Sequence, residues 1–381
     1  MIKIEYKKDC CGCGACYINC PQHCISMTRD SEGFLYPEVD ELDCIDCGQC
    51  ETVCPIINAP YALGKSEAWA VYAKQEQLVN ASSSGGVFSV LAETVINNGG
   101  QVFGAAFDEK WQLKTCKAET IEELAPLRKA KYVQCETNNA FYEIKKLLEA
   151  GAKVLYCSTP CQIAGLLSFL DKEYDNLYTM DFICHGVVSP DVWQQYIASY
   201  KTTVECVNFR DKRKGWESNS VCLTLMDGKE IVESNADNAY MQAFLSGLSM
   251  RPSCFSCRFK GLHRTCDITV GDLWGAKYQC PDGYNEFGTS LVLTHGKKGQ
   301  QLIDKCKDKL HIVNAPMPAS IAFNGSIKES VEEPEKRGVF MEKYKEEDFN
   351  SIVQKCLPSK KISPKPSLWN RIITILKMKL Q

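Results

Sequence analysis

Long apolar segments are missing from the 381-residue chain, and no stretch approaches the roughly 20 apolar residues that a membrane-spanning helix needs. Residues 1–6 show no basic segment followed by an apolar one, so we expect no secretory signal peptide and a cytoplasmic protein. An excess of one charge is also missing, because 44 Lys and Arg stand against 47 Asp and Glu. The net charge of −3 provides no overall field that would attract nucleic acid or an anionic membrane.

Several nucleotide and hydrolase motifs are also absent from the sequence. No G-x-G-x-x-G follows an expected strand, which excludes the usual dinucleotide-binding turn, and there is no Walker A motif. The chain has no C-x3-C-x2-C run, so radical S-adenosylmethionine chemistry has no ligand set here. The nucleophile elbow of the hydrolases is missing too. The chemistry must therefore come from other residues.

Cysteine is what the chain has in excess, at 23 of 381 residues. In a reducing compartment, thiols are more often metal ligands or catalytic groups than disulfides. Eight cysteines spell C-x2-C-x2-C-x3-C-P twice, and they are Cys10, Cys13, Cys16 and Cys20, followed by Cys44, Cys47, Cys50 and Cys54. This spacing is typical of bacterial ferredoxins with two [4Fe–4S] clusters, so we expect one-electron transfer.

In two-cluster ferredoxins, the fourth cysteine of each run ligates the other cluster. The expected ligands of cluster I are therefore Cys10, Cys13, Cys16 and Cys54. Those of cluster II are Cys20, Cys44, Cys47 and Cys50. Zinc is the alternative metal, although zinc sites do not normally use four cysteines at this spacing. Cys11 and Cys24 fall outside the repeat and are interpreted as ordinary thiols.

The sequence patterns divide the chain into three parts. Residues 1–60 form the expected ferredoxin-like domain, with a β-hairpin arm at residues 33–37. Residues 61–330 alternate strands and helices, which predicts an α/β domain with a mixed sheet. Residues 331–381 are expected to be a charged linker and a C-terminal amphipathic helix. That helix, residues 367–380, could lie on a membrane surface, dock on a partner or fold back onto its own domain.

Within the larger part, residues 81–86 are expected to open a helix that ends near residue 97. The clearest unit is a strand over residues 153–157, a helix over 161–170 and a strand over 177–183. The crossover of such a unit is right-handed and its two strands are parallel.

Seven short segments give the larger part a specific resemblance. They are Ser83-Ser84-Gly85-Gly86, Lys131-Tyr132-Val133-Gln134, Thr159-Pro160-Cys161-Gln162, Cys184-His185-Gly186, Phe209-Arg210-Asp211-Lys212, Arg251-Pro252-Ser253-Cys254-Phe255-Ser256-Cys257 and Asp267-Ile268-Thr269-Val270-Gly271-Asp272. In this order they resemble the coenzyme F420 hydrogenase/dehydrogenase beta-subunit family over roughly residues 1–310. Members of that family are flavoproteins that hold FAD beside a [4Fe–4S] cluster and exchange electrons with a two-electron substrate. The resemblance implies the cofactor and the reaction type, whereas the substrate varies among members, from a deazaflavin to chlorophyll-type pigments.

Two helix starts agree with this implied FAD site. Ser83-Ser84-Gly85-Gly86 places small side chains and free amides where a phosphate group could bind, with a plain helix cap as the alternative. Thr159 and Gln162 lie at the start of a second helix and are assigned to the same cofactor. The dipole of that helix is expected to lower the pKa of Cys161, which suits a cluster ligand or a thiol next to flavin.

Basic side chains are a second element of the expected FAD site. Arg210 and Lys212 belong to a basic loop that could hold the FAD phosphates or an acidic substrate. A solvated charged loop is an equally good interpretation. Lys131 is expected to serve the same role as these two residues.

A third [4Fe–4S] cluster is expected in the larger domain, because a C-x2-C pair, Cys254 and Cys257, follows an apolar helix. Its proposed ligands are Cys161, Cys184, Cys254 and Cys257. Cys135 and Cys266 are the alternatives for the first two positions. A structural zinc ion, with Cys266 and Cys280, is the alternative to a cluster.

His185 follows Cys184 at the carboxyl end of an expected parallel strand, where open α/β sheets place ligands. It could donate a proton to reduced substrate or flavin and is the candidate catalytic residue. A structural histidine that orients the turn is at least as good an interpretation.

The function expected from these residues is an iron–sulfur flavoprotein oxidoreductase. Electrons would pass between a ferredoxin or other redox protein, the clusters, FAD and a small-molecule substrate in either direction. The sensitivity of such clusters to oxygen suggests an anaerobic setting. A non-catalytic electron-transfer subunit and a flavin-free redox sensor are the alternatives.

Overall fold

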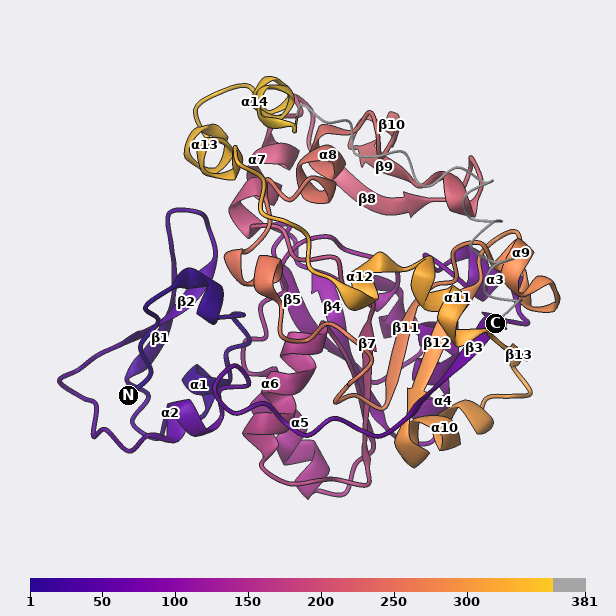
Figure 1. Cartoon of the computed structure of the whole chain (residues 1–381), viewed down its shortest axis with the longest axis horizontal. Helices are drawn as coiled ribbons and strands as arrows, with labels where there is room; N and C mark the ends of the chain where they lie inside the picture. Colours follow the sequence, from indigo (N-terminus) through magenta and orange to yellow (C-terminus); the bar gives the residue numbers. More distant parts are fainter. Residues whose placement is uncertain (359–381) are drawn as a thin grey trace.

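The computed structural model of the protein describes residues 1–358. Figure 1 shows a small N-terminal unit, built from a hairpin and two short helices, beside a larger α/β domain. The helix expected over residues 367–380 lies outside the described residues. In the described part, no helix is long and apolar enough to cross a membrane.

The N-terminal unit folds the two cysteine runs in the same way. Its elements are α1 (Ala15–Ile18), β1 (Ile25–Arg29), β2 (Leu35–Val39) and α2 (Gln49–Thr52). Each helix is a single turn that follows a left-handed glycine, Gly14 at φ 79° and Gly48 at φ 73°. Such a backbone is strained for other residues, so glycine lets the chain turn sharply between the cysteines. The hairpin β1–β2 is antiparallel and confirms the expected arm.

The central sheet of the larger domain has eight strands in the order β13-β3-β12-β11-β7-β6-β4-β5. Their bounds are β3 (Ser66–Ala73), β4 (Gln101–Phe107), β5 (Leu113–Ala118), β6 (Val154–Cys157), β7 (Leu177–Phe182), β11 (Ile268–Asp272), β12 (Ser290–His295) and β13 (Leu310–Asn314). β4, β6, β7 and β11 pair in parallel, whereas β5, β12 and β13 run against their neighbours. β3 runs opposite to β12, so it points the same way as the four parallel strands. The α/β class with a mixed sheet is therefore confirmed, and so are the parallel strands at residues 153–157 and 177–183.

Helices cover both faces of this sheet. The main ones are α3 (Glu76–Asn80), α4 (Val87–Asn97), α5 (Ala140–Glu149), α6 (Pro160–Leu170) and α10 (Gly296–Asp304), with short α9 (Ala276–Gln279), α11 (Met317–Ala322) and α12 (Gly325–Lys328). α4 and α10 share one apolar core with β3, β4 and β6, and α5 and α6 share another with β4, β6 and β7. The N-terminal unit packs on the second face, since its Cys11, Cys13 and Ala15 belong to the same core as α5 and α6.

A second, three-stranded antiparallel sheet lies beside the first (Figure 1). It consists of β8 (Val204–Asp211), β9 (Ser220–Leu225) and β10 (Glu230–Ser234), and it packs with α7 (Pro190–Ala198) and α8 (Ala239–Leu245). The expectation of one mixed sheet over residues 61–330 was thus too simple. Strands joined by short connections pair with each other here and not with the central sheet.

The segment expected to be a charged linker is folded over residues 337–356. α13 (Arg337–Lys343) and α14 (Phe349–Cys356) place Phe340, Tyr344 and Phe349 in the core of the smaller sheet. Apart from the buried Arg337, most charged residues of this segment are exposed, which explains why its sequence resembles a linker. The sequence-based boundary at residue 331 therefore does not separate this segment from the larger domain.

Candidate functional site

The carboxyl ends of the parallel strands gather the candidate residues at one edge of the central sheet. The Ser83–Gly86 segment lies between β3 and α4, Thr159 and Cys161 follow β6, and Cys184 follows β7. Open α/β sheets bind their ligands at this edge. These three segments, distant in the sequence, thus meet at the carboxyl ends of the parallel strands, as the order of strands and helices suggests.

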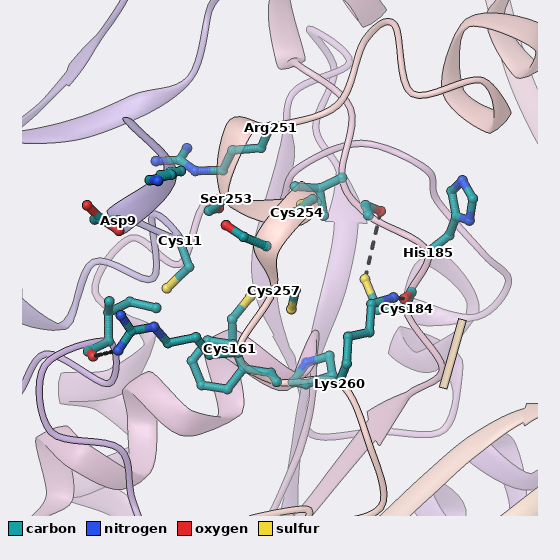
Figure 2. A pocket seen from close by; sticks show the side chains of 18 of the residues that line it. Asp9, Cys11, Cys161, Cys184, His185, Arg251, Ser253, Cys254, Cys257 and Lys260 are labelled. Atoms are coloured by element: carbon teal, nitrogen blue, oxygen red, sulfur yellow. Dashed lines mark hydrogen bonds between the residues drawn. The ribbon is translucent and has the colours of Figure 1, made fainter. Parts of the chain in front are cut away.

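A cavity of about 240 Å³ lies between this edge and the N-terminal unit. Its walls include five cysteines, which are Cys11, Cys161, Cys184, Cys254 and Cys257. Figure 2 shows the sulfur atoms of these side chains around the same space. We call this space the sulfur cavity. It brings together the four cysteines expected for a third cluster and adds one that the sequence reasoning had set aside.

Local backbone geometry holds these cysteines in place. Cys161 is in the first turn of α6, directly after Pro160. Cys254 lies in a 3₁₀ helix, Pro252–Ser256, where its amide donates to the carbonyl of Arg251 at 2.9 Å. The amide of Cys257 donates to Ser330 Oγ at 3.0 Å. Gly186 permits the close approach of the Cys184 loop, because a Cβ there would lie 2.2 Å from Met250 Cε.

The thiols of the sulfur cavity favour their protonated form. Burial raises the pKa of Cys254 to about 12, and it also raises the pKa of Cys184 and Cys257. A hydrogen bond with Cys11, followed by burial, raises the pKa of Cys161. The expectation that the dipole of α6 would lower this pKa was therefore wrong, since contact with a second thiol and loss of water outweigh it. Binding of iron here must release protons.

The size of the cavity helps to distinguish a cluster from a single ion. Thiolates around one zinc ion lie about 4 Å apart, because Zn–S bonds are about 2.3 Å long. Across residues 1–358, no three His, Cys, Asp or Glu side chains are grouped closely enough to hold one metal ion. The cysteines instead line a cavity with room for a polynuclear group. Cys266 and Cys280, the further ligands of the zinc alternative, are not among its wall residues.

Around the sulfur cavity, five Lys and Arg side chains outnumber a single acidic residue, Asp9. Lys260 donates to the carbonyls of Cys184 and Ser326, and Arg251 and Arg258 also line the walls. Arg264 is there too, but it is paired with Asp181 at 3.2 Å. An anionic group in the cavity would therefore meet fixed cations, as a cluster with four thiolate ligands would require.

Cys11 was missed as a cavity residue because its position depends on contact between the two parts of the chain. Its thiol is close enough to those of Cys13 and Cys161 to shift their shared proton equilibria. Cys13 in turn packs on α6, where a Cβ on Gly165 would lie 2.9 Å from its Sγ. No spacing rule selects Cys11, since it simply follows Cys10. Cys135, an alternative ligand in the sequence-based prediction, is not a wall residue.

The cysteines expected for clusters I and II lie in two groups inside the N-terminal unit. A small hollow is lined by all four expected ligands of cluster II, Cys20, Cys44, Cys47 and Cys50, and also by Cys24. For cluster I, burial raises the pKa of Cys16 to about 12, and the nearby thiols of Cys10 and Cys54 contribute. Of the eight cysteines, Cys47 is the exposed one.

The basic residues expected at an FAD site lie against the Ser83–Gly86 segment. Lys212 Nζ donates to the carbonyl oxygens of Val79, at 2.8 Å, and Ser84, at 3.0 Å. Ser83 Oγ accepts from the amide of Ala130 at 2.7 Å, which holds the loop of Lys131 against the same segment. Gly85 N donates to Ser290 Oγ at 3.0 Å. Ser83 and the Gly85 amide are thus engaged in holding the loops together.

Lys131 and Lys212 have no carboxylate at ion-pair distance among the described residues. Burial lowers the pKa of each lysine to about 8, and Lys129 contributes to both shifts. Both side chains are half-buried, and their amino groups bond only to backbone carbonyls, so their charge is available to an anion. We call Lys131 and Lys212 the lysine pair.

The charge of Arg210, unlike that of the lysine pair, is already balanced by a carboxylate. Its guanidinium forms two hydrogen bonds with Asp272, at 2.7 and 3.3 Å, and lies over the ring of Trp274. Asp272 also accepts from Trp216 Nε1 at 3.1 Å, and the rings of Trp216 and Trp274 stack. Arg210 therefore joins the smaller sheet to the carboxyl end of β11.

The side chains of Thr159 and Gln162 are engaged inside the protein. Gln162 Nε2 donates to the carbonyl of Cys135 at 2.7 Å, and its Oε1 accepts from Thr159 Oγ1 at 3.2 Å. Both residues are buried. They fix the turn that carries Cys161.

His185 lines the sulfur cavity, but Figure 2 shows its ring pointing away from the sulfur atoms. The ring packs edge-on against Phe244, at 5.0 Å between centroids, and Nδ1 is 3.4 Å from Ser326 Oγ. Burial lowers its pKa to about 4, so the ring is neutral near pH 7. This environment suits a residue that orients the turn, and the catalytic role of His185 stays a prediction.

Comparison with known proteins identifies both parts of the chain. Residues 151–319 match the model for the C terminus of the coenzyme F420 hydrogenase/dehydrogenase beta subunit, and residues 9–57 match a 4Fe-4S dicluster domain. Ferredoxins from Saccharopolyspora erythraea and Streptomyces griseus are 40% and 42% identical over 60 residues, which is 16% of this chain and 52% of each ferredoxin. The chain thus spans about half the length of these curated relatives. A solved structure of the F420-reducing [NiFe] hydrogenase complex from Methanosarcina barkeri covers 77% of this chain and 91% of its own, at 14% identity and a TM-score of 0.45. Residues 151–319 are therefore a domain similar to the C terminus of the coenzyme F420 hydrogenase/dehydrogenase beta subunit, and residues 9–57 are a domain of the 4Fe-4S dicluster type.

Proposed function

We propose that this protein is an iron–sulfur flavoprotein oxidoreductase that moves electrons between a protein redox partner and a two-electron small-molecule substrate. The observation that carries the proposal is the sulfur cavity, which joins four cysteines of the larger domain to the N-terminal unit. A third [4Fe–4S] cluster fits this donor set of four thiols in a cationic surrounding. FAD, bound at the lysine pair, would supply the step that converts single electrons into a two-electron transfer.

Exposure supports electron entry at the cluster II side of the N-terminal unit. Cys47 is exposed, and so are the apolar side chains of Leu42 and Ile45 in the same loop. A partner that docks there would approach the cysteines of cluster II closely. Cluster I would lie against α6, because its expected ligand Cys13 contacts Gly165 of that helix.

The next step inward is supported by a row of three thiols. Cys13 is an expected ligand of cluster I, Cys161 is a wall residue of the sulfur cavity, and the thiol of Cys11 is a neighbour of both. Short contacts between ligands of neighbouring centres favour direct electron transfer.

The lysine pair supports binding of the FAD phosphates near the carboxyl end of β3, on the same side of the central sheet as the sulfur cavity. From β3 to β7 there are three strand spacings, which is roughly 14 Å. An extended dinucleotide can cover that separation, with its phosphates at the lysine pair and its ring system near Cys184. Ser84 and Lys212 would then hold one end of the cofactor, and the loop of Cys184 and His185 would border the other.

Anaerobic measurement of iron, sulfide and flavin on one preparation tests the proposal. We expect about twelve iron atoms, from three four-iron clusters, and one FAD per chain. The double variant Cys254→Ser/Cys257→Ser should lose about four iron atoms and keep the other eight. Cys280→Ser/Cys306→Ser, which changes two buried thiols outside the cavity, is the matched control and should keep all twelve. Equal iron in wild type and the first variant would refute the third cluster, and flavin-free protein with full iron would refute the FAD site.

A further inference from the structure

Arg251 is a fully buried cation without an acidic partner. Its exposed fraction is 0%, which places it among the largest fully buried side chains. Its guanidinium donates to the carbonyl of Cys10 at 2.9 Å, the carbonyl of Leu35 at 2.9 Å and Gln134 Oε1 at 3.0 Å. All three acceptors are neutral. Within residues 1–358, no carboxylate is at ion-pair distance from Arg251.

Three other buried arginines of this chain each form an ion pair with a carboxylate. Arg264 pairs with Asp181, Arg210 pairs with Asp272, and Arg337 pairs with Glu32. Burying an unpaired guanidinium destabilises the folded chain strongly unless a counter-charge is close. The rings of Phe34 and Tyr36, at 5.4 and 4.2 Å from the guanidinium, lower this cost but carry no net charge. The folded chain therefore keeps a positive charge that its own carboxylates do not balance.

The position of Arg251 identifies what could balance it. Its side chain reaches the carbonyl of Cys10, an expected ligand of cluster I. Its own backbone begins the helical turn that carries Cys254, and Figure 2 shows Arg251 beside the sulfur cavity. The thiol neighbours that act on its charge come from both sides, namely Cys10 and Cys11 from the N-terminal unit and Cys254 from the larger domain. Arg251 thus lies between the site of cluster I and the sulfur cavity.

We propose that Arg251 is the shared counter-charge of cluster I and the third cluster, and that it makes both easier to reduce. A four-iron cluster with four thiolates is anionic, and each added electron increases its negative charge. A fixed guanidinium between the two sites stabilises that added electron on either side. An electron that passes from one centre to the other would need no proton and no bond change, and it would stay close to the same cation throughout. This inference rests on the proposed third cluster.

The test is a potentiometric titration, followed by electron paramagnetic resonance, of wild type and variants that keep full iron. In Arg251→Met, reduction of cluster I and of the third cluster should become at least tenfold less favourable, which is about 59 mV for one electron. Cluster II should keep its potential, because none of its expected ligands is among the residues that bond or act on Arg251. Arg251→Lys keeps the charge and should show a smaller shift than Arg251→Met.

A second variant keeps the arginine in case its removal prevents folding. Gln134→Glu places a carboxylate at the position of an existing hydrogen bond to the guanidinium, and it should shift the same two potentials in the same direction. Arg337→Met is the matched control. Arg337 also joins the N-terminal hairpin to the larger domain, through Glu32 and the carbonyl of Met250, but its charge is already paired. This control should lower stability and leave the potentials unchanged.

The possible outcomes separate this inference from the proposed function. Unchanged potentials of both centres in Arg251→Met and Gln134→Glu, at full iron, would overturn the role of Arg251. A shift in all three clusters, or an equal shift in Arg337→Met, would also overturn it, because a loosened interface would then explain the result. Absence of a third cluster signal in wild type would refute the proposed function instead.

Discussion

Cys11 is the residue whose interpretation changes most between sequence and structure. Five thiols line the sulfur cavity, but a four-iron cluster takes four, so one of them remains a thiol. We expect Cys11→Ala to keep about twelve iron atoms per chain, because Cys161, Cys184, Cys254 and Cys257 remain. It should slow electron transfer from cluster I to the third cluster, since the thiol next to Cys161 in the wall of the cavity is lost. Iron analysis and freeze-quenched resonance spectra measure the two effects.

The control for this prediction is Cys24→Ala, which removes the other cysteine of the N-terminal unit that lies outside the two cysteine runs. Cys24 is near Cys20, with 3.4 Å between the two sulfur atoms, and it is not a wall residue of the sulfur cavity. The Cys24→Ala variant should leave the rate of electron transfer from cluster I to the third cluster unchanged. Loss of four iron atoms in Cys11→Ala would show that Cys11 is a ligand and that one of the other four cysteines is not.

At the scale of elements, the loops of the lysine pair predict how flavin binding depends on pH. The pKa of each lysine is lowered to about 8, so the free protein loses these charges as pH rises through that value. Phosphate groups bind the protonated form, so FAD affinity should be highest below pH 8. Above it, affinity should fall by roughly one to two orders of magnitude up to pH 9 if both lysines take part. Fluorescence titration of protein from which FAD has been removed measures this profile.

Variants at the lysine pair give the corresponding comparison. Lys131→Met and Lys212→Met should each weaken FAD binding at pH 7 and make the pH profile less steep. Lys336→Met is the control, because Lys336 also donates to a backbone carbonyl, that of Lys355, on an element remote from the sheet edge. A profile that stays flat in the wild type would contradict a phosphate site at these two residues.

The elements also show how far the sequence could predict this site. Spacing along the chain identified the eight ferredoxin cysteines, and strand order identified the edge where Cys161 and Cys184 meet. Arg251 and Cys11 could not be recognised in this way, because their contacts join residues of the N-terminal unit to distant parts of the larger domain. The helices at residues 337–356 were missed for a related reason, since their apolar residues become meaningful only when the smaller sheet is present to cover them.

At the scale of the whole molecule, charge is distributed unevenly although its sum is small. Residues 30–64 contain eight Asp and Glu and neither Lys nor Arg. Glu41 and Asp43 are exposed in the loop that leads to Cys47, next to the exposed Leu42. Such a face attracts partners with a basic surface and repels acidic ones, and the effect weakens with salt.

We therefore expect the chemically reduced protein to pass electrons faster to a basic c-type cytochrome than to an acidic ferredoxin. The rate with the cytochrome should fall on the order of tenfold as ionic strength rises from low to physiological values. Glu41→Lys/Asp43→Lys should lower that rate at low salt and reduce its salt dependence. Glu342→Lys/Glu346→Lys, at one exposed residue in the last turn of α13 and one just after it, changes the net charge equally and should have little effect. Stopped-flow absorbance measures the rates of the wild type with each acceptor and of the two double variants with the cytochrome. Equal effects of the two double variants would show that net charge, and not the face around Cys47, governs the encounter.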